Sequence, residues 1–174
     1  MKPIYFISLL MIINYSCSSK KETPEQIESR KTLPSFQYKG ETIYVSESDN
    51  SEGIKWGYCT DAINDAQSVE NGQNNTKAIV SFINDNHGEE YAAKLCNNLV
   101  SNGFDDWYLP SQNELAELYK NKDRIGNFSG KIYLSSTQVN YVEVSGVSFF
   151  DGTIFTNLSP GDNFPCRCIR KDNK

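Results

Sequence analysis

The stretch "GFDDWYLPSQNELAEL" (103–118) constrains the fold most, because it marks where a helix begins. Ser111 and Glu114 form an S-x-x-E capping box, in which each side chain accepts a free backbone N–H of the first helical turn. Pro110 disfavours helical backbone at the residue before it, so the chain reaches this helix in an extended conformation. The helix should end near Asn121. Each of these residues has a local structural role, which favours a device that secures the fold over a catalytic loop.

Helical spacing also occurs upstream of this stretch. "NNTKAIVSFI" (74–83) has Asn75 placed to cap a short helix. "EEYAAKLCNNLVSNG" (89–103) ends at Gly103, which is typical of a helix C-cap. One face of this second helix would carry Ala92, Leu95, Cys96 and Leu99.

The remaining segments alternate as strands do. Gly146 interrupts the alternation of "YVEVSGVSFF" and predicts a β-bulge, and Asp151-Gly152 predicts a tight hairpin. The 18 Asn and 11 Gly residues favour turns, so we expect a loop-rich chain. The sequence predicts an α+β fold with two main helices and a small twisted antiparallel sheet. Its expected strands are "ETIYVS" (41–46), "IKWGYC" (54–59), "KIYLSS" (131–136), "YVEVSGVSFF" (141–150), "TIFT" (153–156) and "FPCRCIR" (164–170), with "DNSEG" (49–53) as a turn.

The N-terminal residues have the pattern of an export signal. Lys2 precedes an apolar run (4–13) that is too short to span a bilayer and has the length of a signal-peptide core. Ser16 and Cys17 follow, which resembles a bacterial lipoprotein signal whose first mature residue is a lipidated cysteine. We therefore expect a lipoprotein signal peptide over 1–16 and a lipid anchor on Cys17. An ordinary secretory signal with a nearby cleavage site is the alternative.

A tether and one globular domain should follow the signal. Residues 18–35 contain almost no large apolar side chains and two prolines, so they cannot pack a core. We assign 17–36 to the lipidated cysteine and a flexible tether, and 37–171 to the domain. Such an anchor holds a domain in the water beside a membrane. The expected location is the cell envelope, on the outer membrane, facing the periplasm or the cell surface.

Charge and cysteine content limit the partners. The chain has 17 Lys and Arg against 22 Asp and Glu, a net charge of −5, and no basic cluster, which argues against nucleic acid. If the chain is exported, the four cysteines besides Cys17 leave the reducing cytosol and can form disulfides. Four cysteines can pair in three different ways. Their spacing lacks the paired C-x-x-C motifs of a zinc site, so no metal is expected there. These four are Cys59, Cys96, Cys166 and Cys168.

Four motifs in order carry a family resemblance: "GFDDWYLPSQNELAELY", "YLSST", "SFFDG" and "CRCIR". Together they resemble the Lcl C-terminal domain family over about residues 53–170. Two positions depart from that pattern, because Leu134 stands where the family often has Trp and Tyr108 where many members have Arg. The residues that carry the motif are Trp107, Leu109, Pro110, Ser111, Glu114, Leu115, Ser135, Ser136, Asp151, Gly152, Arg167 and Arg170.

The resemblance implies a C-type lectin-like domain, a fold associated with binding more than with catalysis. It also implies a disulfide between the helix cysteine and the last strand, Cys96–Cys168, which leaves Cys59 to pair with Cys166. A Cys59–Cys96 bond is the close alternative. The fold is similar to that of the formylglycine-generating enzymes, but their catalytic motif is absent here.

The residues themselves offer little for catalysis. His87 is the single histidine, and no nucleophile, base and orienting group surround it in the pattern of an active site. Asp105 and Asp106 are adjacent, which suits a turn or the surface better than paired acid and base. We therefore expect no enzyme activity and no cofactor.

Binding residues are easier to nominate. Asn157, Asp162 and Asn163, with Asp151, could offer oxygen ligands to calcium, although turn formation is the simpler explanation. Arg167 and Arg170 suit either an anion contact or an ion pair with Glu114 or Asp106, and the acidic chain favours the ion pair. The leading hypothesis is a non-catalytic, lipid-anchored envelope module that binds an extracellular glycan or protein. The alternative is a structural or assembly component of an envelope protein complex.

Overall fold

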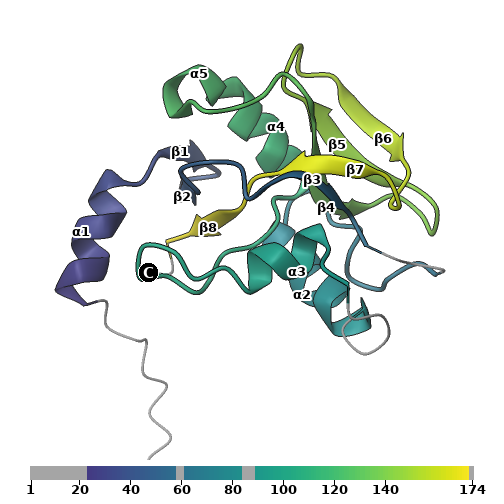
Figure 1. The fold of residues 1–174 in the computed structure, drawn as a ribbon, viewed down its shortest axis with the longest axis horizontal. Coiled ribbons are helices and arrows are strands. Elements are labelled where there is room, and N and C mark those ends of the chain that lie inside the picture. The colour runs from purple at the N-terminus through teal and green to yellow at the C-terminus, as the bar shows by residue number, and fades with distance from the viewer. Residues whose placement is uncertain (1–22, 58–60, 84–88, 173–174) are drawn as a thin grey trace, which may run out of the picture.

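The computed structural model describes residues 23–57, 61–83 and 89–172, which form a mixed α+β fold (Figure 1). The expected α+β class is therefore confirmed, although the strands divide among three small sheets instead of one. The helices are α1 (Pro24–Thr32), α2 (Gly72–Ile83), α3 (Ala92–Asn97), α4 (Gln112–Lys120) and α5 (Lys122–Ile125). The strands are β1 (Ser35–Tyr38), β2 (Glu41–Val45), β3 (Ser51–Lys55), β4 (Ile132–Gln138), β5 (Val144–Ser148), β6 (Ile154–Leu158), β7 (Asn163–Cys166) and β8 (Ile169–Lys171).

The strand pairs within the described residues are antiparallel, and several of them join distant parts of the chain. The sheets have the orders β1-β2-β8, β3-β7 and β4-β5-β6. Ile43 of β2 lies opposite Lys171 of β8, and Lys55 of β3 lies opposite Asn163 of β7. The β4-β5-β6 meander shifts register beside Gly146, so the predicted bulge is confirmed. Thus the first strands of the domain depend on its last strands for their pairing.

The predicted final strand "FPCRCIR" is broken in two, which corrects the sequence analysis. Its first part is β7, which pairs with β3, and its second part is β8, which pairs with β2. Arg167 and Cys168 lie at the break, with Arg167 wholly buried among backbone carbonyls. The expected turn at 49–53 is also shortened, because β3 begins at Ser51 to meet Cys166. Periodicity along one segment cannot reveal a change of partner strand.

Two helix boundaries differ from those expected. α2 begins at Gly72, and Asn71, not Asn75, supplies the cap, since its Oδ1 accepts the N–H of Asn74 at 3.1 Å. Asn75 is buried instead, with its amide bonded to the carbonyl oxygen of Ser68 at 2.6 Å. Asn71 and Asn75 lie four positions apart, and the packing of the folded chain, which buries Asn75, decides which of them caps the helix.

Gly103 does not close a helix, because α3 ends at Asn97. Asn102 and Gly103 both have positive φ, at 54° and 76°, and they connect Ser101 to Phe104. Those two residues exchange backbone hydrogen bonds of 3.0 Å each. Two consecutive left-handed residues with Asn-Gly sequence are typical of a type I′ hairpin turn. The pair therefore makes a β-turn where a C-cap was expected.

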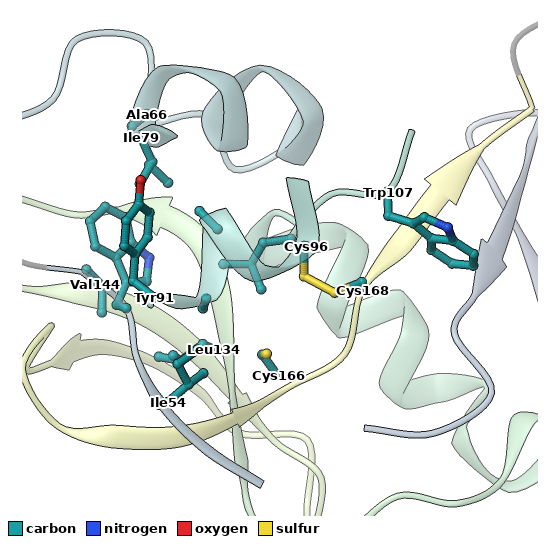
Figure 2. Packing of buried hydrophobic residues seen from close by; sticks show 14 of the residues in the cluster. Ile54, Ala66, Ile79, Tyr91, Cys96, Trp107, Leu134, Val144, Cys166 and Cys168 are labelled. Carbon is teal, nitrogen blue, oxygen red and sulfur yellow. A yellow bond between two sulfur atoms is a disulfide. The ribbon is translucent and has the colours of Figure 1, made fainter. Parts of the chain in front are cut away.

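Two packed clusters make up the core. The larger lies between α2, α3 and the β3-β7 and β4-β5-β6 strands, and it includes Trp56, Trp107 and Leu134 (Figure 2). The smaller lies under α4 and includes Tyr108, Leu115 and Leu118. Leu134, one of the two positions that depart from the Lcl C-terminal pattern, is fully buried and therefore belongs to the core.

The cysteines support one of the expected bonds. Cys96 of α3 and Cys168 form a disulfide, with Cα atoms 5.5 Å apart, so this prediction is confirmed (Figure 2). Cys166 is buried and bonds to none of the described cysteines. Burial raises the pKa of its thiol to about 12. Cys59, its expected partner, lies outside the described residues, and so does Cys17.

The packed part of the chain begins earlier than the expected boundary at Gln37. Leu33 and Phe36 are 5% and 2% exposed, respectively, although both fall in the segment assigned to the tether. α1 precedes them, and Gln26 donates its side-chain N–H to the carbonyl oxygen of Gly103 at 2.5 Å. The signal peptide over 1–16 lies outside the described residues. Among the residues that are described, no helix combines the length and apolar character needed to span a bilayer.

Candidate functional site

The segment from Trp107 to Ser111 connects the sheets and positions the start of α4. Tyr108 and Ile169 of β8 exchange backbone hydrogen bonds of 2.8 and 3.0 Å. Pro110 accepts the N–H of Ser136 on β4 at 2.7 Å. The motif stretches around Trp107, Ser136 and Ile169 are therefore neighbours in space, as well as members of one sequence pattern.

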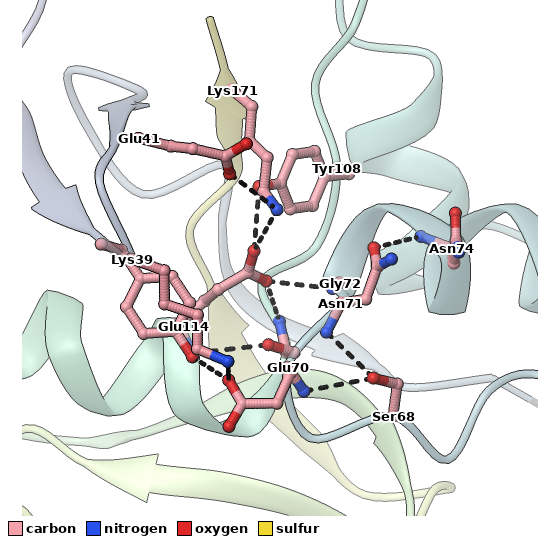
Figure 3. A network of polar contacts seen from close by, with 12 residues as sticks. Lys39, Glu41, Ser68, Glu70, Asn71, Gly72, Asn74, Tyr108, Glu114 and Lys171 are labelled. Atoms are coloured by element: carbon pink, nitrogen blue, oxygen red, sulfur yellow. Dashed lines mark hydrogen bonds and ion pairs between the residues drawn. The ribbon is translucent and has the colours of Figure 1, made fainter.

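Ser111 caps α4 as predicted, and Glu114 completes the capping box. Glu114 is fully buried and also serves a second helix, because its Oε2 accepts the N–H of Ser111 at 2.8 Å and that of Gly72 at 3.0 Å. Its Oε1 accepts the hydroxyl of Tyr108 at 3.1 Å and lies 3.5 Å from Nζ of Lys171 (Figure 3). This carboxylate thus joins the starts of α2 and α4 to β8. Its role is structural.

Replacing Glu114 by alanine should lower the free energy of unfolding by about 3 kcal/mol, because it leaves three buried donors without an acceptor. Glu114→Gln keeps an oxygen for the two backbone N–H groups and should cost only about 1 kcal/mol. Urea unfolding of each variant measures both changes. Glu117→Ala is the matched control on the same helix. Its carboxylate pairs with exposed Lys120, so it should change stability by less than about 0.5 kcal/mol. An alanine variant as stable as this control would contradict the assignment.

An open hollow of about 560 Å³ lies beside α4, and we call it the α4 groove. One side is α4 itself, and the others are the β1–β2 turn, Glu70 and the β5–β6 turn. Gly152, with φ of 81°, lets the β5–β6 turn pack against Tyr119. The residues that line the groove are Tyr38, Lys39, Glu70, Asn113, Ala116, Glu117, Tyr119, Lys120, Asp151, Gly152 and Ile154.

Glu70 organises the polar end of the groove (Figure 3). Its Oε1 accepts the side-chain amide of Asn113 at 2.7 Å, and its Oε2 accepts the hydroxyl of Tyr38 and lies 2.8 Å from Nζ of Lys39. The Lys39 ammonium and the Tyr38 hydroxyl lower the pKa of Glu70 to about 2. Burial, together with the bond to Glu70, raises the pKa of Tyr38. At neutral pH the carboxylate is therefore charged and the phenol holds its proton.

The groove combines aromatic rings with paired charges. Tyr38 and Tyr119 are partly buried. The Lys39 Nζ lies 5.5 Å from the centre of the Tyr38 ring, and the Lys122 Nζ lies 4.7 Å from the centre of the Tyr119 ring. Glu70 pairs with Lys39, and Glu117 pairs with Lys120 at 2.8 Å. Such a surface offers ring faces and amide or hydroxyl groups with little unpaired charge. That composition suits an uncharged, hydroxyl-rich ligand better than an ion.

The two arginines of the last motif have structural partners. Arg170 forms hydrogen bonds of 2.6 and 3.0 Å to both oxygens of Asp106, so one of the expected pairs is confirmed. Arg167 pairs with Asp49, which the sequence analysis did not nominate, at 2.9 Å. Both side chains are at least 97% buried, which leaves no surface for an anion contact. The anion hypothesis is therefore wrong for both residues as the chain is folded.

The residues nominated for calcium do not form an acidic cluster. Asn157 lies on the exposed part of β6, and Asp162 and Asn163 are exposed where β7 begins. Asp151 is bound within its own turn, since its Oδ1 accepts the N–H of Thr153 at 3.0 Å, which lowers the pKa of the carboxyl group. No group of three or more acidic, His or Cys side chains with metal-binding geometry occurs in the part of the chain that is described. His87 lies outside that part.

The other motif residues pack the fold. Trp107, Leu109, Leu115, Ser135 and Ser136 are all at most 2% exposed. The groove residues Tyr38, Glu70 and Tyr119 escaped the sequence analysis. They come from three distant segments with no shared pattern, so no local signal could have grouped them.

No protein-family model and no curated protein matches the chain.

Proposed function

We propose that this chain is a non-catalytic binding module of the cell envelope, lipid-anchored at Cys17, which recognises an extracellular glycan through the α4 groove. A C-type lectin-like domain of the Lcl C-terminal type is part of this proposal. The meeting of its motif stretches at Tyr108, Ser136 and Ile169 supports that likeness. The anchor enters from the sequence of residues 1–17.

The observation that carries the proposal is the pairing of charges around two partly exposed tyrosines. Sugar rings stack on aromatic faces through their C–H groups, and their hydroxyls bond amides and carboxylates. Tyr38 and Tyr119 supply the faces, and Asn113 supplies an amide at the same groove. Because Glu70 is held by Lys39 and Tyr38, it is poorly suited to move protons as a general acid or base.

A role as an assembly component of an envelope complex is the second candidate. The exposed apolar side chains around the β4-β5-β6 sheet favour it, since such side chains mark contacts with other proteins when they gather in one patch. The two surfaces meet at Ile154, which lines the α4 groove and is also one of these exposed apolar side chains.

A glycan array probed with the full-length, oxidised protein tests the proposal. We expect binding to one class of glycan, and Tyr38→Ala and Asn113→Ala should each weaken that binding about tenfold or more by removing a ring or an amide. Asn74→Ala is the control, because it removes an exposed amide on α2 that does not line the groove. Circular dichroism should show that all three variants keep the fold.

Two results of this experiment would count against the proposal. A folded protein that binds no glycan contradicts the glycan function. Glycan binding that both groove variants leave unchanged contradicts the α4 groove as the site. We also expect the binding to persist in EDTA, because the exposed oxygen ligands Asn157, Asp162 and Asn163 do not join a described acidic cluster. Loss of binding in EDTA would assign a role to calcium.

A further inference from the structure

β6 forms the outer edge of its sheet, and this edge lacks the usual protection against pairing. Within the described residues β6 pairs with β5 alone, and it lies at the rim of the molecule in Figure 1. No charged residue occurs from Gly152 to Gly161, and β6 itself contains no proline. Natural edge strands commonly carry lysine, proline or inward charges that stop other strands from adding to them. Its residues Ile154, Phe155 and Thr156 have high strand propensity.

Exposed apolar side chains gather at both ends of this edge. Of the nine large hydrophobic side chains exposed among the described residues, five belong to the β4-β5-β6 sheet and its turns, so they form a local feature. Phe150 and Ile154, 79% and 43% exposed, lie at the beginning of β6. The other three lie in the β4–β5 turn beside the end of β6, because Leu158 pairs with Val144. They are Val139, Tyr141 and Val142.

The arrangement fits a second copy of this chain. Two identical strands that pair antiparallel about a two-fold axis place the beginning of each beside the end of the other. Phe150 and Ile154 of one copy would then approach the β4–β5 turn of the second, so apolar groups meet apolar groups. A second copy also brings the same net charge of −5. β6 itself carries no charged side chain, so like charges approach one another only at the ends of the paired strands, where Asp151 of one copy lies toward Glu143 of the other.

We propose that β6 is a dimerisation strand, which pairs antiparallel with β6 of a second copy to join two three-stranded sheets into one continuous sheet. The Phe150 turn of each copy packs beside the β4–β5 turn of the other. Ile154 belongs both to this contact and to the lining of the α4 groove, whereas Asn113 and Glu117 on α4 lie outside the paired strands. The dimer does not depend on the groove binding any ligand.

Sedimentation velocity of the full-length chain, in one detergent buffer throughout, tests this proposal. We expect a concentration-dependent dimer for the natural sequence. Thr156 is exposed in the middle of β6, so Thr156→Lys and Thr156→Glu should each weaken the dimer at least about tenfold by bringing like charges together. An equal mixture of the two variants should recover the dimer, because the opposite charges then face each other across the edge. Ser81→Lys adds the same charge on exposed α2 and should leave association unchanged.

Mixing the Thr156→Lys and Thr156→Glu variants distinguishes association through β6 from association through another surface. A chain that is monomeric at every concentration overturns the proposal. A dimer that persists unchanged in both Thr156 variants overturns it as well, and would place the contact elsewhere. Weak dimers of each single variant that stay weak in the mixture would contradict strand pairing through β6.

Discussion

Arg167→Ala should destabilise this protein by about 4 kcal/mol, the largest effect that we expect from any single substitution. The Arg167 side chain is fully buried, and its Nη1 donates to Asp49 and to the carbonyl oxygen of Asn127 at 2.9 Å each. Its Nε and Nη2 donate to the carbonyl oxygens of Ser46 and Glu47 at 2.8 and 3.0 Å. Alanine leaves these acceptors and one carboxylate without the cation that satisfies them.

The matched comparison for this variant is Arg124→Ala. Arg124 is an exposed arginine that bonds the carbonyl oxygen of Ser35, so its loss should cost less than about 1 kcal/mol. Arg167→Lys keeps the charge but cannot reproduce the planar fork, and we expect an intermediate loss of about 2 kcal/mol. Urea unfolding followed by tryptophan fluorescence measures all three. An Arg167→Ala protein as stable as Arg124→Ala would show that the buried contacts contribute little.

Removing the Cys96–Cys168 bond should have an effect of similar size. The bond closes a loop with a sequence separation of 72, and chain-entropy arguments assign such a loop about 4 kcal/mol. The Cys96→Ser, Cys168→Ser double variant should therefore melt about 10 °C below the natural protein. Thermal unfolding by circular dichroism under oxidising conditions measures this shift.

The control for the cysteine experiment is Cys166→Ala. Cys166 is buried but forms no bond to a described cysteine, so its replacement removes little volume and should lower stability by roughly 1 kcal/mol. Peptide mapping without reduction should recover Cys96 linked to Cys168. A double variant that melts with the natural protein, or a map that links Cys96 elsewhere, would overturn this connectivity.

Local signals predicted local structure well. The capping box at Ser111 and Glu114 and the bulge beside Gly146 each depend on residues a few positions apart, and both are present. A turn at Gly152 is present too, but five residues separate β5 from β6, so the connection is wider than the tight hairpin that was expected. The α+β class followed from the same signals. Asn102-Gly103 shows the limit of such reasoning, since the same dipeptide can end a helix or turn a hairpin.

Contacts between distant segments were mostly beyond prediction. The break between β7 and β8 depends on β3 and β2, which lie more than a hundred residues earlier. Asp49 pairs with Arg167 because the two loops come together in the folded chain, and no spacing in the sequence predicts this ion pair. The family resemblance supplied the one distant pair that was predicted correctly among the cysteines, Cys96–Cys168. The α4 groove is built from four segments that are distant in the sequence, so it could be found only in the folded chain.

The pairing of β2 with β8 has a consequence for the timing of synthesis. Ile43, Tyr44 and Val45 have their partners at Lys171, Arg170 and Ile169, so the ribosome must add more than a hundred further residues before the edge of β2 that faces away from β1 can pair. Until then this apolar strand is open to wrong partners, and a nascent domain cannot finish folding piece by piece. Folding of this sheet can therefore finish only once β8 is available.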